Sequence, residues 1–237
     1  MRTIASAILL CHLFASSFSP AQNAEGFYLL AQLKANEEDY KGAIEECNSA
    51  VELNSKYIDA YYLRGLAKSF TGNYRGAIED YSKVIELDQG EKDAFVLRGL
   101  AKQEIYDYTG AIADYNAALW IAPSFYDAYE ARAGLKFHLE DYRGAIEDYN
   151  KVAKLNPENS TTYYWRGSAY SQIGKLRKAI KDYTKAISIN PHYGSAYYSR
   201  GLTYLMIGSK NKGCLDLSKA GELGESNAYG AIRQFCN

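Results

Sequence analysis

The sequence has little proline, histidine or cysteine and almost no net charge. It holds 4 prolines, 3 histidines and 4 cysteines in 237 residues, and 27 basic side chains are balanced by 28 acidic ones. A net charge of −1 gives no field that would hold a polyphosphate or an anionic membrane surface, so we predict no nucleic-acid partner. With so little proline, the 23 tyrosines indicate regular structure in which aromatic rings pack at recurring places.

The sequence also lacks the residue sets that metal binding or catalysis requires. His138 and His192 are far apart, and neither has cysteine or carboxylate neighbours at metal-ligand spacing. The glycines recur at helix contacts and turns instead of forming a phosphate-binding loop, and no serine, histidine and aspartate have a reason to converge. We therefore predict that the protein is not an enzyme and takes no cofactor, metal or small-molecule substrate.

Residues 1–21 are predicted to be an export signal. Arg2 supplies a positive start, the apolar stretch Ile4–Phe14 follows, and small residues ending at Ala21 offer a cleavage site. The stretch is too short for a comfortable membrane span, so we predict no integral span. The alternative is a buried N-terminal helix, which the lack of an amphipathic pattern disfavours. The mature chain would begin near Gln22 and be periplasmic or secreted.

The rest of the chain repeats with a period of 34 residues. The string Arg-Gly-x-Ala, or a near variant, recurs in that step at Arg64, Arg98, Arg132, Arg166 and Arg200. No insertion breaks the period, so the units are residues 24–57, 58–91, 92–125, 126–159, 160–193 and 194–227. Within a unit, apolar and small residues fall at helical spacing on both sides of a short polar interruption. Each unit is therefore predicted to be two helices joined by a tight turn.

The pattern within each unit resembles the tetratricopeptide repeat family. The fifth unit carries the aromatic, small and large residues of that pattern and its closing proline, at Tyr163, Gly167, Ala179, Tyr183, Ala186 and Pro191. The resemblance covers residues 24–227, and the atypical first and last units suit the two ends of a stack. It implies an all-α, right-handed superhelical solenoid of six helix-turn-helix repeats, because one helix pair cannot bury its own apolar face.

Two columns of charged residues run down the repeats. The arginine of each unit from the second onward is matched sixteen residues later by Asp80, Asp114, Asp148, Asp182 or Asp216. We predict bidentate pairs that join the two helices of one repeat; the alternative is an arginine ladder for anionic ligands. The second column is Lys34, Lys68, Lys102 and Lys136, followed five residues later by Asp39, Asn73, Asp107 and Asp141. This spacing predicts local charge matching; the alternative is a basic groove for a ligand.

In this family the first helix of each unit lines the concave face, so the resemblance places partner binding there. The fifth and ninth residues of the units give the candidates Tyr28, Gln32, Tyr62, Leu66, Val96, Leu100, Glu130, Gly134, Tyr164, Ser168, Tyr198 and Leu202. Aromatic and aliphatic side chains with little charge suit a protein or peptide partner. One alternative is that several of them pack between neighbouring first helices. Another is a structural or assembly role that uses the convex face or the repeat ends.

The last residues, 228–237, are predicted to form a helix that caps the stack. Ala228, Ile232 and Phe235 share a helical face, and Ser226 is a candidate N-cap residue. Such a helix would cover the exposed end of the sixth repeat.

The stretch from Cys214 to Cys236 resembles the closing segment of exported tetratricopeptide proteins of Gram-negative bacteria. In an oxidising compartment this resemblance implies a disulfide between the two cysteines. Cys47 stands where tyrosine recurs in other units and is expected to be a buried free thiol.

Overall fold

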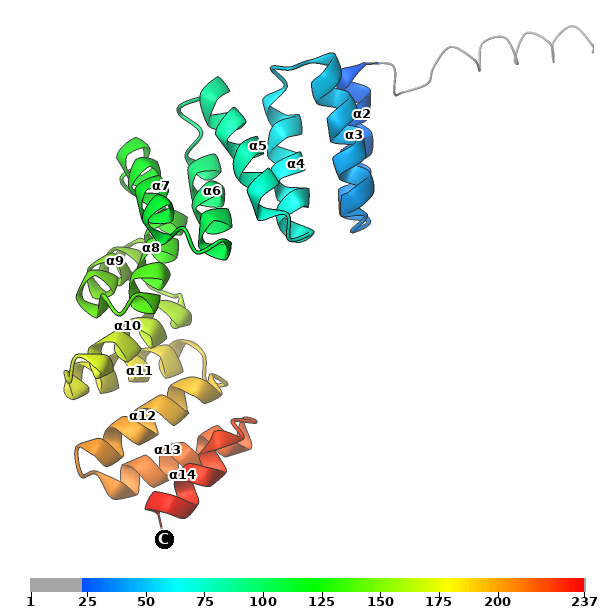
Figure 1. Ribbon diagram of the computed structural model, residues 1–237. Coiled ribbons are helices and arrows are strands. Elements are labelled where there is room, and N and C mark those ends of the chain that lie inside the picture. Colours follow the sequence, from blue (N-terminus) through cyan, green and yellow to red (C-terminus); the bar gives the residue numbers. More distant parts are fainter. Residues whose placement is uncertain (1–22, 237) are drawn as a thin grey trace, which may run out of the picture. The chain divides into compact units, whose positions relative to one another are not determined.

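The computed structural model describes residues 23–236, so the predicted export signal over residues 1–21 lies outside the described residues. Within residues 23–236 every regular element is an α-helix. The helices are α2 (Ala24–Asn36), α3 (Tyr40–Leu53), α4 (Ile58–Phe70), α5 (Tyr74–Leu87), α6 (Lys92–Glu104), α7 (Tyr108–Ile121), α8 (Tyr126–His138), α9 (Tyr142–Leu155), α10 (Ser160–Gln172), α11 (Leu176–Ile189), α12 (Gly194–Met206), α13 (Lys210–Glu222) and α14 (Asn227–Phe235). Six helix hairpins follow one another along the chain, and α14 comes last (Figure 1). The predicted all-α organisation in helix-turn-helix repeats is confirmed.

The turn inside each repeat contains a left-handed residue, and in the first four repeats a side-chain cap of the next helix follows it. The left-handed residue is glycine in three repeats and a larger residue in the others: Gly72, Gly174, Gly208, Glu38, Tyr106 and Glu140. Next, the side chain of Asp39 accepts a hydrogen bond of 3.0 Å from the backbone N–H of Gly42. Asn73, Asp107 and Asp141 cap α5, α7 and α9 in the same way. The left-handed residue is common to all six repeats, and every second helix starts two residues after it.

A tyrosine of the second helix packs against a small residue of the first helix. Tyr81 is fully buried, and a Cβ atom on Gly65 would lie only 2.8 Å from its ring. The same contact joins Tyr183 to Gly167, where an added Cβ atom would lie 2.9 Å from the ring. Glycine at this position therefore lets the two helices of a repeat approach closely around one large aromatic side chain.

The chain divides into two compact units, one ending at Asp114 and the other beginning at Tyr115. The core of the first unit includes a cluster of Ala77, Tyr81 and Ala101, which come from consecutive repeats. The core of the second unit includes Ala186, Ile187 and Ala196, which also come from consecutive repeats. In each unit the apolar core is thus completed by stacking one repeat on the next, as expected of a repeat array.

Helix α14 packs against α13, and the structure corrects two details of the predicted cap. Its buried residues are Ala228 and Ala231, whereas Phe235 is 43% exposed. Ser226 makes no side-chain hydrogen bond at the start of the helix, because its backbone is already helical instead of extended as in an N-cap residue. A disulfide joins Cys214 of α13 to Cys236 at the end of α14, with the Cα atoms 5.7 Å apart.

Candidate functional site

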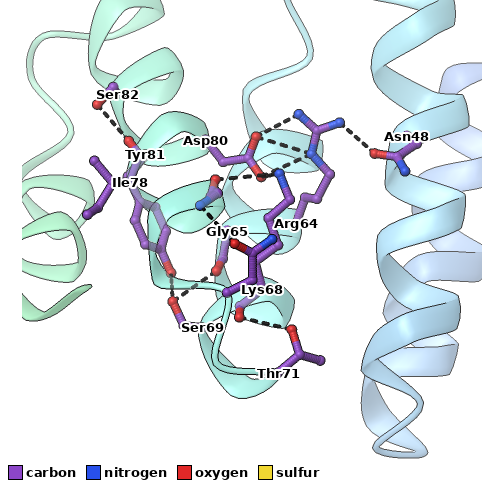
Figure 2. A network of polar contacts seen from close by, with 12 residues as sticks. Asn48, Arg64, Gly65, Lys68, Ser69, Thr71, Ile78, Asp80, Tyr81 and Ser82 are labelled. Carbon is purple, nitrogen blue, oxygen red and sulfur yellow. Dashed lines mark hydrogen bonds and ion pairs between the residues drawn. The ribbon is translucent and has the colours of Figure 1, made fainter. Parts of the chain in front are cut away.

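Each repeat from the second onward contains a buried arginine–aspartate pair between its two helices. In the second repeat, Arg64 Nε and Nη2 donate to the two carboxylate oxygens of Asp80 over 3.0 and 2.6 Å (Figure 2). Asp80 is only 2% exposed, so this charge depends on its cationic partners. The same bidentate geometry joins Arg98 to Asp114, Arg132 to Asp148, Arg166 to Asp182 and Arg200 to Asp216.

The remaining nitrogen of each arginine reaches the preceding repeat. Arg64 Nη1 donates to the side-chain oxygen of Asn48 over 2.8 Å, and its Cζ atom lies 5.2 Å from the centroid of the Tyr61 ring. In the later repeats the acceptors are Ser82, Asn116, Asn150 and Thr184. A carboxylate, a polar side chain and an aromatic ring therefore engage each guanidinium. This saturation disfavours the alternative of an arginine ladder for anionic ligands.

The lysine column pairs with the buried aspartates, and the predicted local charge matching is wrong. Lys68 Nζ lies 2.8 Å from Asp80, and Lys102 and Lys136 lie at the same distance from Asp114 and Asp148. The lysines turn inward because a buried carboxylate attracts a cation more strongly than a solvated one. The polar residues five positions after the lysines cap the second helices instead.

The fifth and sixth repeats lack this lysine, so their aspartates depend on arginine alone. Tyr170 replaces the lysine in the fifth repeat, and Lys178 Nζ lies 5.4 Å from its ring centroid. Lys212 lies in the same way over Tyr204 in the sixth repeat. The first repeat has neither arginine nor aspartate in these columns, and Lys34 pairs there with Glu46 over 2.6 Å.

Six of the predicted lining residues border three surface pockets. Two of these pockets lie between consecutive first helices, and the third lies between α12 and α14. Leu66 and Leu100 line a pocket of about 350 Å³ between the second and third repeats. Glu130 and Gly134 line one of about 640 Å³ between the fourth and fifth repeats. Tyr198 and Leu202 line one of about 670 Å³ beside α14. Apolar pockets of this size suit the anchoring side chains of a partner.

Other predicted lining residues pack inside the repeats. Val96 is only 6% exposed and belongs to the core, so its assignment to a binding surface is wrong. A short branched side chain does not extend beyond the helix interface as a tyrosine does. Three half-buried tyrosines form ring pairs, namely Tyr28–Tyr57 at 5.2 Å, Tyr62–Tyr81 at 6.2 Å and Tyr164–Tyr193 at 5.0 Å between centroids. Burial raises the pKa of Tyr62 to about 12.

The pockets also contain exposed apolar residues that we did not predict, because we considered only the fifth and ninth positions of each repeat. Phe70 and Met206, each the thirteenth residue of its repeat, are 67% and 66% exposed. Trp165, the sixth residue of its repeat, is 42% exposed. For Phe70 and Met206 the available signal was a large apolar side chain in a column that is otherwise polar, with Asn36 and Glu104 at the thirteenth position. The sixth position, with Leu29, Leu63 and Leu97, gave no such signal for Trp165.

The described residues offer neither a metal site nor a reactive thiol at these pockets. Within residues 23–236 no three side chains of histidine, cysteine, aspartate or glutamate gather as a metal site would require. Over the same residues, each helix is too short or too polar to cross a bilayer. Cys47 is fully buried, and burial raises the pKa of its thiol to about 12, so it stays protonated at neutral pH.

Family models match two long parts of the chain. Models described as tetratricopeptide repeat match residues 24–57, 58–91 and 160–193, and one described as TPR repeat matches residues 135–174. No curated protein sequence matches the chain significantly.

Solved structures with the same fold cover most of the described repeats. A crystal structure of MamA is 28% identical, with a TM-score of 0.66 over 73% of this chain and 94% of that chain. The structure of YrrB, described as a TPR protein with an unusual peptide-binding site, is 21% identical, with a TM-score of 0.68 over 79% of this chain and 97% of that one. MamA from Desulfovibrio magneticus RS-1 is 18% identical, with a TM-score of 0.67 over 71% and 96%. The last two likenesses concern the fold alone.

Proposed function

This chain belongs to the tetratricopeptide repeat family, and from that premise we propose that it is a non-catalytic scaffold for a protein or peptide partner. The partner binds along the concave groove that the first helices of such repeats line. The observation that carries the proposal is that each compact unit has pockets on its first helices that hold exposed aromatic or aliphatic side chains. The peptide-binding site named for YrrB is consistent with it.

We further propose that the scaffold acts in the periplasm or outside the cell. The apolar N-terminal stretch with its small-residue cleavage site supports export. The pairing of Cys214 with Cys236 supports it independently, because disulfides persist in oxidising compartments and are rare in the cytosol.

Groove binding predicts that the two faces of the repeats respond differently to the same substitution. Leu100 in a first helix and Leu155 in a second helix are each 42% exposed, so Leu100→Glu and Leu155→Glu form a matched pair. We expect Leu100→Glu to abolish recovery of the partner from envelope extract and Leu155→Glu to leave it unchanged. Quantitative mass spectrometry of material captured on the mature protein measures both.

The opposite result would favour a structural or assembly role on the outer surface. Trp120 in the second helix α7 is 86% exposed and would belong to such a surface. Loss of the partner with Leu155→Glu or Trp120→Ser, but not with Leu100→Glu, would reject the groove. Circular dichroism of each variant shows that the fold is intact.

Export predicts a mature chain that begins at or near Gln22. Intact-mass spectrometry of the protein purified from the envelope or the medium is expected to find this start and no acyl chain on the polypeptide. A mature species that retains residues 1–10 would contradict cleavage, and recovery of the full-length chain from the cytosol would contradict export.

A further inference from the structure

The pocket between the fourth and fifth repeats is aromatic and holds two carboxylates, whereas the pocket between the second and third repeats holds one, that of Glu104, and the pocket beside α14 holds none. Phe137 lines it, with its ring centroid 5.3 Å from that of Trp165 and 5.2 Å from that of Tyr142, both in edge-to-face arrangement. Two carboxylates, those of Glu130 and Glu140, border the same pocket. The lining residues include His138 but no lysine or arginine. The site therefore combines ring faces with negative charge, which is the chemistry that holds a cation.

Gly134, the ninth residue of its repeat, lines this pocket without a side chain. The second, third and sixth repeats have leucine there, at Leu66, Leu100 and Leu202. A Cβ atom on Gly134 would meet no atom within 4 Å, so close packing does not explain this glycine. Glycine inside a helix costs roughly 1 kcal/mol relative to alanine. The missing side chain leaves room for a group from outside the chain.

Glu130 is the only charged residue at the fifth position of the six repeats, and a hydrogen bond fixes its carboxylate. The fifth position holds tyrosine or valine in every other repeat, and these side chains pack against neighbouring helices. Glu130 instead accepts a hydrogen bond of 2.9 Å from the hydroxyl of Tyr126 through one carboxylate oxygen. The hydroxyl of Tyr149, which also lines the pocket, makes no hydrogen bond within the described part of the chain. A carboxylate oxygen and a hydroxyl thus remain for a bound group.

We propose that this pocket takes a lysine or arginine side chain of the polypeptide partner. The methylene stem packs on Phe137 and Trp165, and the cationic end interacts with the aromatic faces and with the carboxylate of Glu130. An anionic side chain would meet two carboxylates, and an apolar one would leave Glu130 without a counter-charge. This inference rests on the proposed function, because it names the kind of residue that a groove-bound partner presents.

Four capped peptides test the charge of the occupant. Their sequence is acetyl-Ala-Ala-X-Ala-Ala-amide, where X is lysine, arginine, norleucine or glutamate; norleucine keeps an apolar stem but carries no charge. The protein is the mature chain with Trp120→Phe, a change at an 86% exposed site that leaves Trp165 as the sole tryptophan. Indole N–H chemical shifts then report binding. We expect the lysine and arginine peptides to bind roughly tenfold more tightly than the norleucine peptide.

Three variants separate the proposal from its rivals. Glu130→Gln keeps an acceptor for Tyr126 and is expected to reduce the preference for lysine over norleucine to about twofold or less. Gly134→Leu is expected to abolish binding of all peptides with no loss of thermal stability, and Glu147→Gln, at an exposed carboxylate outside the pocket, to change nothing.

Equal or tighter binding of norleucine, or binding of the glutamate peptide as tight as that of lysine, would overturn the cationic occupant. If the norleucine peptide bound and Gly134→Leu abolished that binding, the pocket would still be a side-chain site of the groove, but its occupant would not be cationic. No shift with any peptide would overturn the pocket as a side-chain site, whereas the Leu100 and Leu155 pair tests groove binding separately.

Discussion

Replacing Arg166 with alanine is expected to destabilise the protein by about 3 to 5 kcal/mol, the cost of leaving a buried charge without its partner. Asp182 is 6% exposed, and Arg166 supplies both of its charge-assisted hydrogen bonds. No lysine compensates, because Tyr170 stands at the lysine position of this repeat. Urea unfolding followed by circular dichroism measures the change in the free energy of unfolding.

The fourth repeat supplies a matched comparison. Arg132→Ala leaves Lys136 at 2.8 Å from Asp148, so we expect a smaller loss of about 1 to 3 kcal/mol. Arg177→Ala, at an exposed arginine of α11, should stay within about 0.5 kcal/mol. A double-mutant cycle of Arg166→Ala with Asp182→Ala should show strong coupling. Strict additivity in the cycle would contradict a structural ion pair, and equal losses for Arg166→Ala and Arg132→Ala would contradict compensation by Lys136.

Reducing the bond between Cys214 and Cys236 is expected to lower the free energy of unfolding by roughly 3 kcal/mol. The bond spans a sequence separation of 22 residues and fixes α14, a helix of 9 residues. A helix of that length does not persist alone in water, so we expect it to fray first when the bond is reduced. Thermal unfolding with and without reductant, followed by circular dichroism, measures the difference.

Counting thiols shows whether the bond is present. Unfolded but unreduced mature protein should expose one thiol, that of Cys47, and the native protein should expose none because Cys47 is fully buried. The Cys47→Ala variant should then have no free thiol in either state. Three reactive thiols after unfolding of the wild-type chain would mean that apolar contacts alone hold α14.

The repeat and its ion pairs could be predicted because each repeat provides an independent copy of the same geometry. Arg64 and Asp80 are sixteen residues apart, and the identical separation in four later repeats is hard to explain unless the two side chains meet. The coincident absence of both in the first repeat points the same way.

The prediction for the lysine column was wrong because sequence spacing alone did not select between two polar partners. Lys68 has a polar residue five positions on and Asp80 twelve positions on, and only the fold shows that Asn73 is occupied by the backbone N–H of Gly76. The prediction that Val96 lines the binding surface was wrong for a related reason. The column indicates the direction of a side chain, but the size of that side chain decides whether it reaches the surface.

The pockets could not be predicted, because each depends on side chains from two successive elements. The ring of Trp165 meets that of Phe137 across the contact between α8 and α10, and no periodicity within one repeat reveals such a neighbour. The useful signal lay in exceptions, such as Gly134 and Glu130 in columns that otherwise hold larger or uncharged residues.

The arginine that bridges to the preceding repeat makes every boundary between repeats chemically alike. Its acceptor always lies sixteen residues upstream and is asparagine, serine or threonine, so the bond depends on a short polar side chain and not on one particular residue. A duplication or deletion of one whole 34-residue unit therefore recreates the same boundary at the junction. The gene that encodes such a chain can lengthen or shorten its array in single steps, and each new repeat arrives with the polar group that its neighbour's arginine needs.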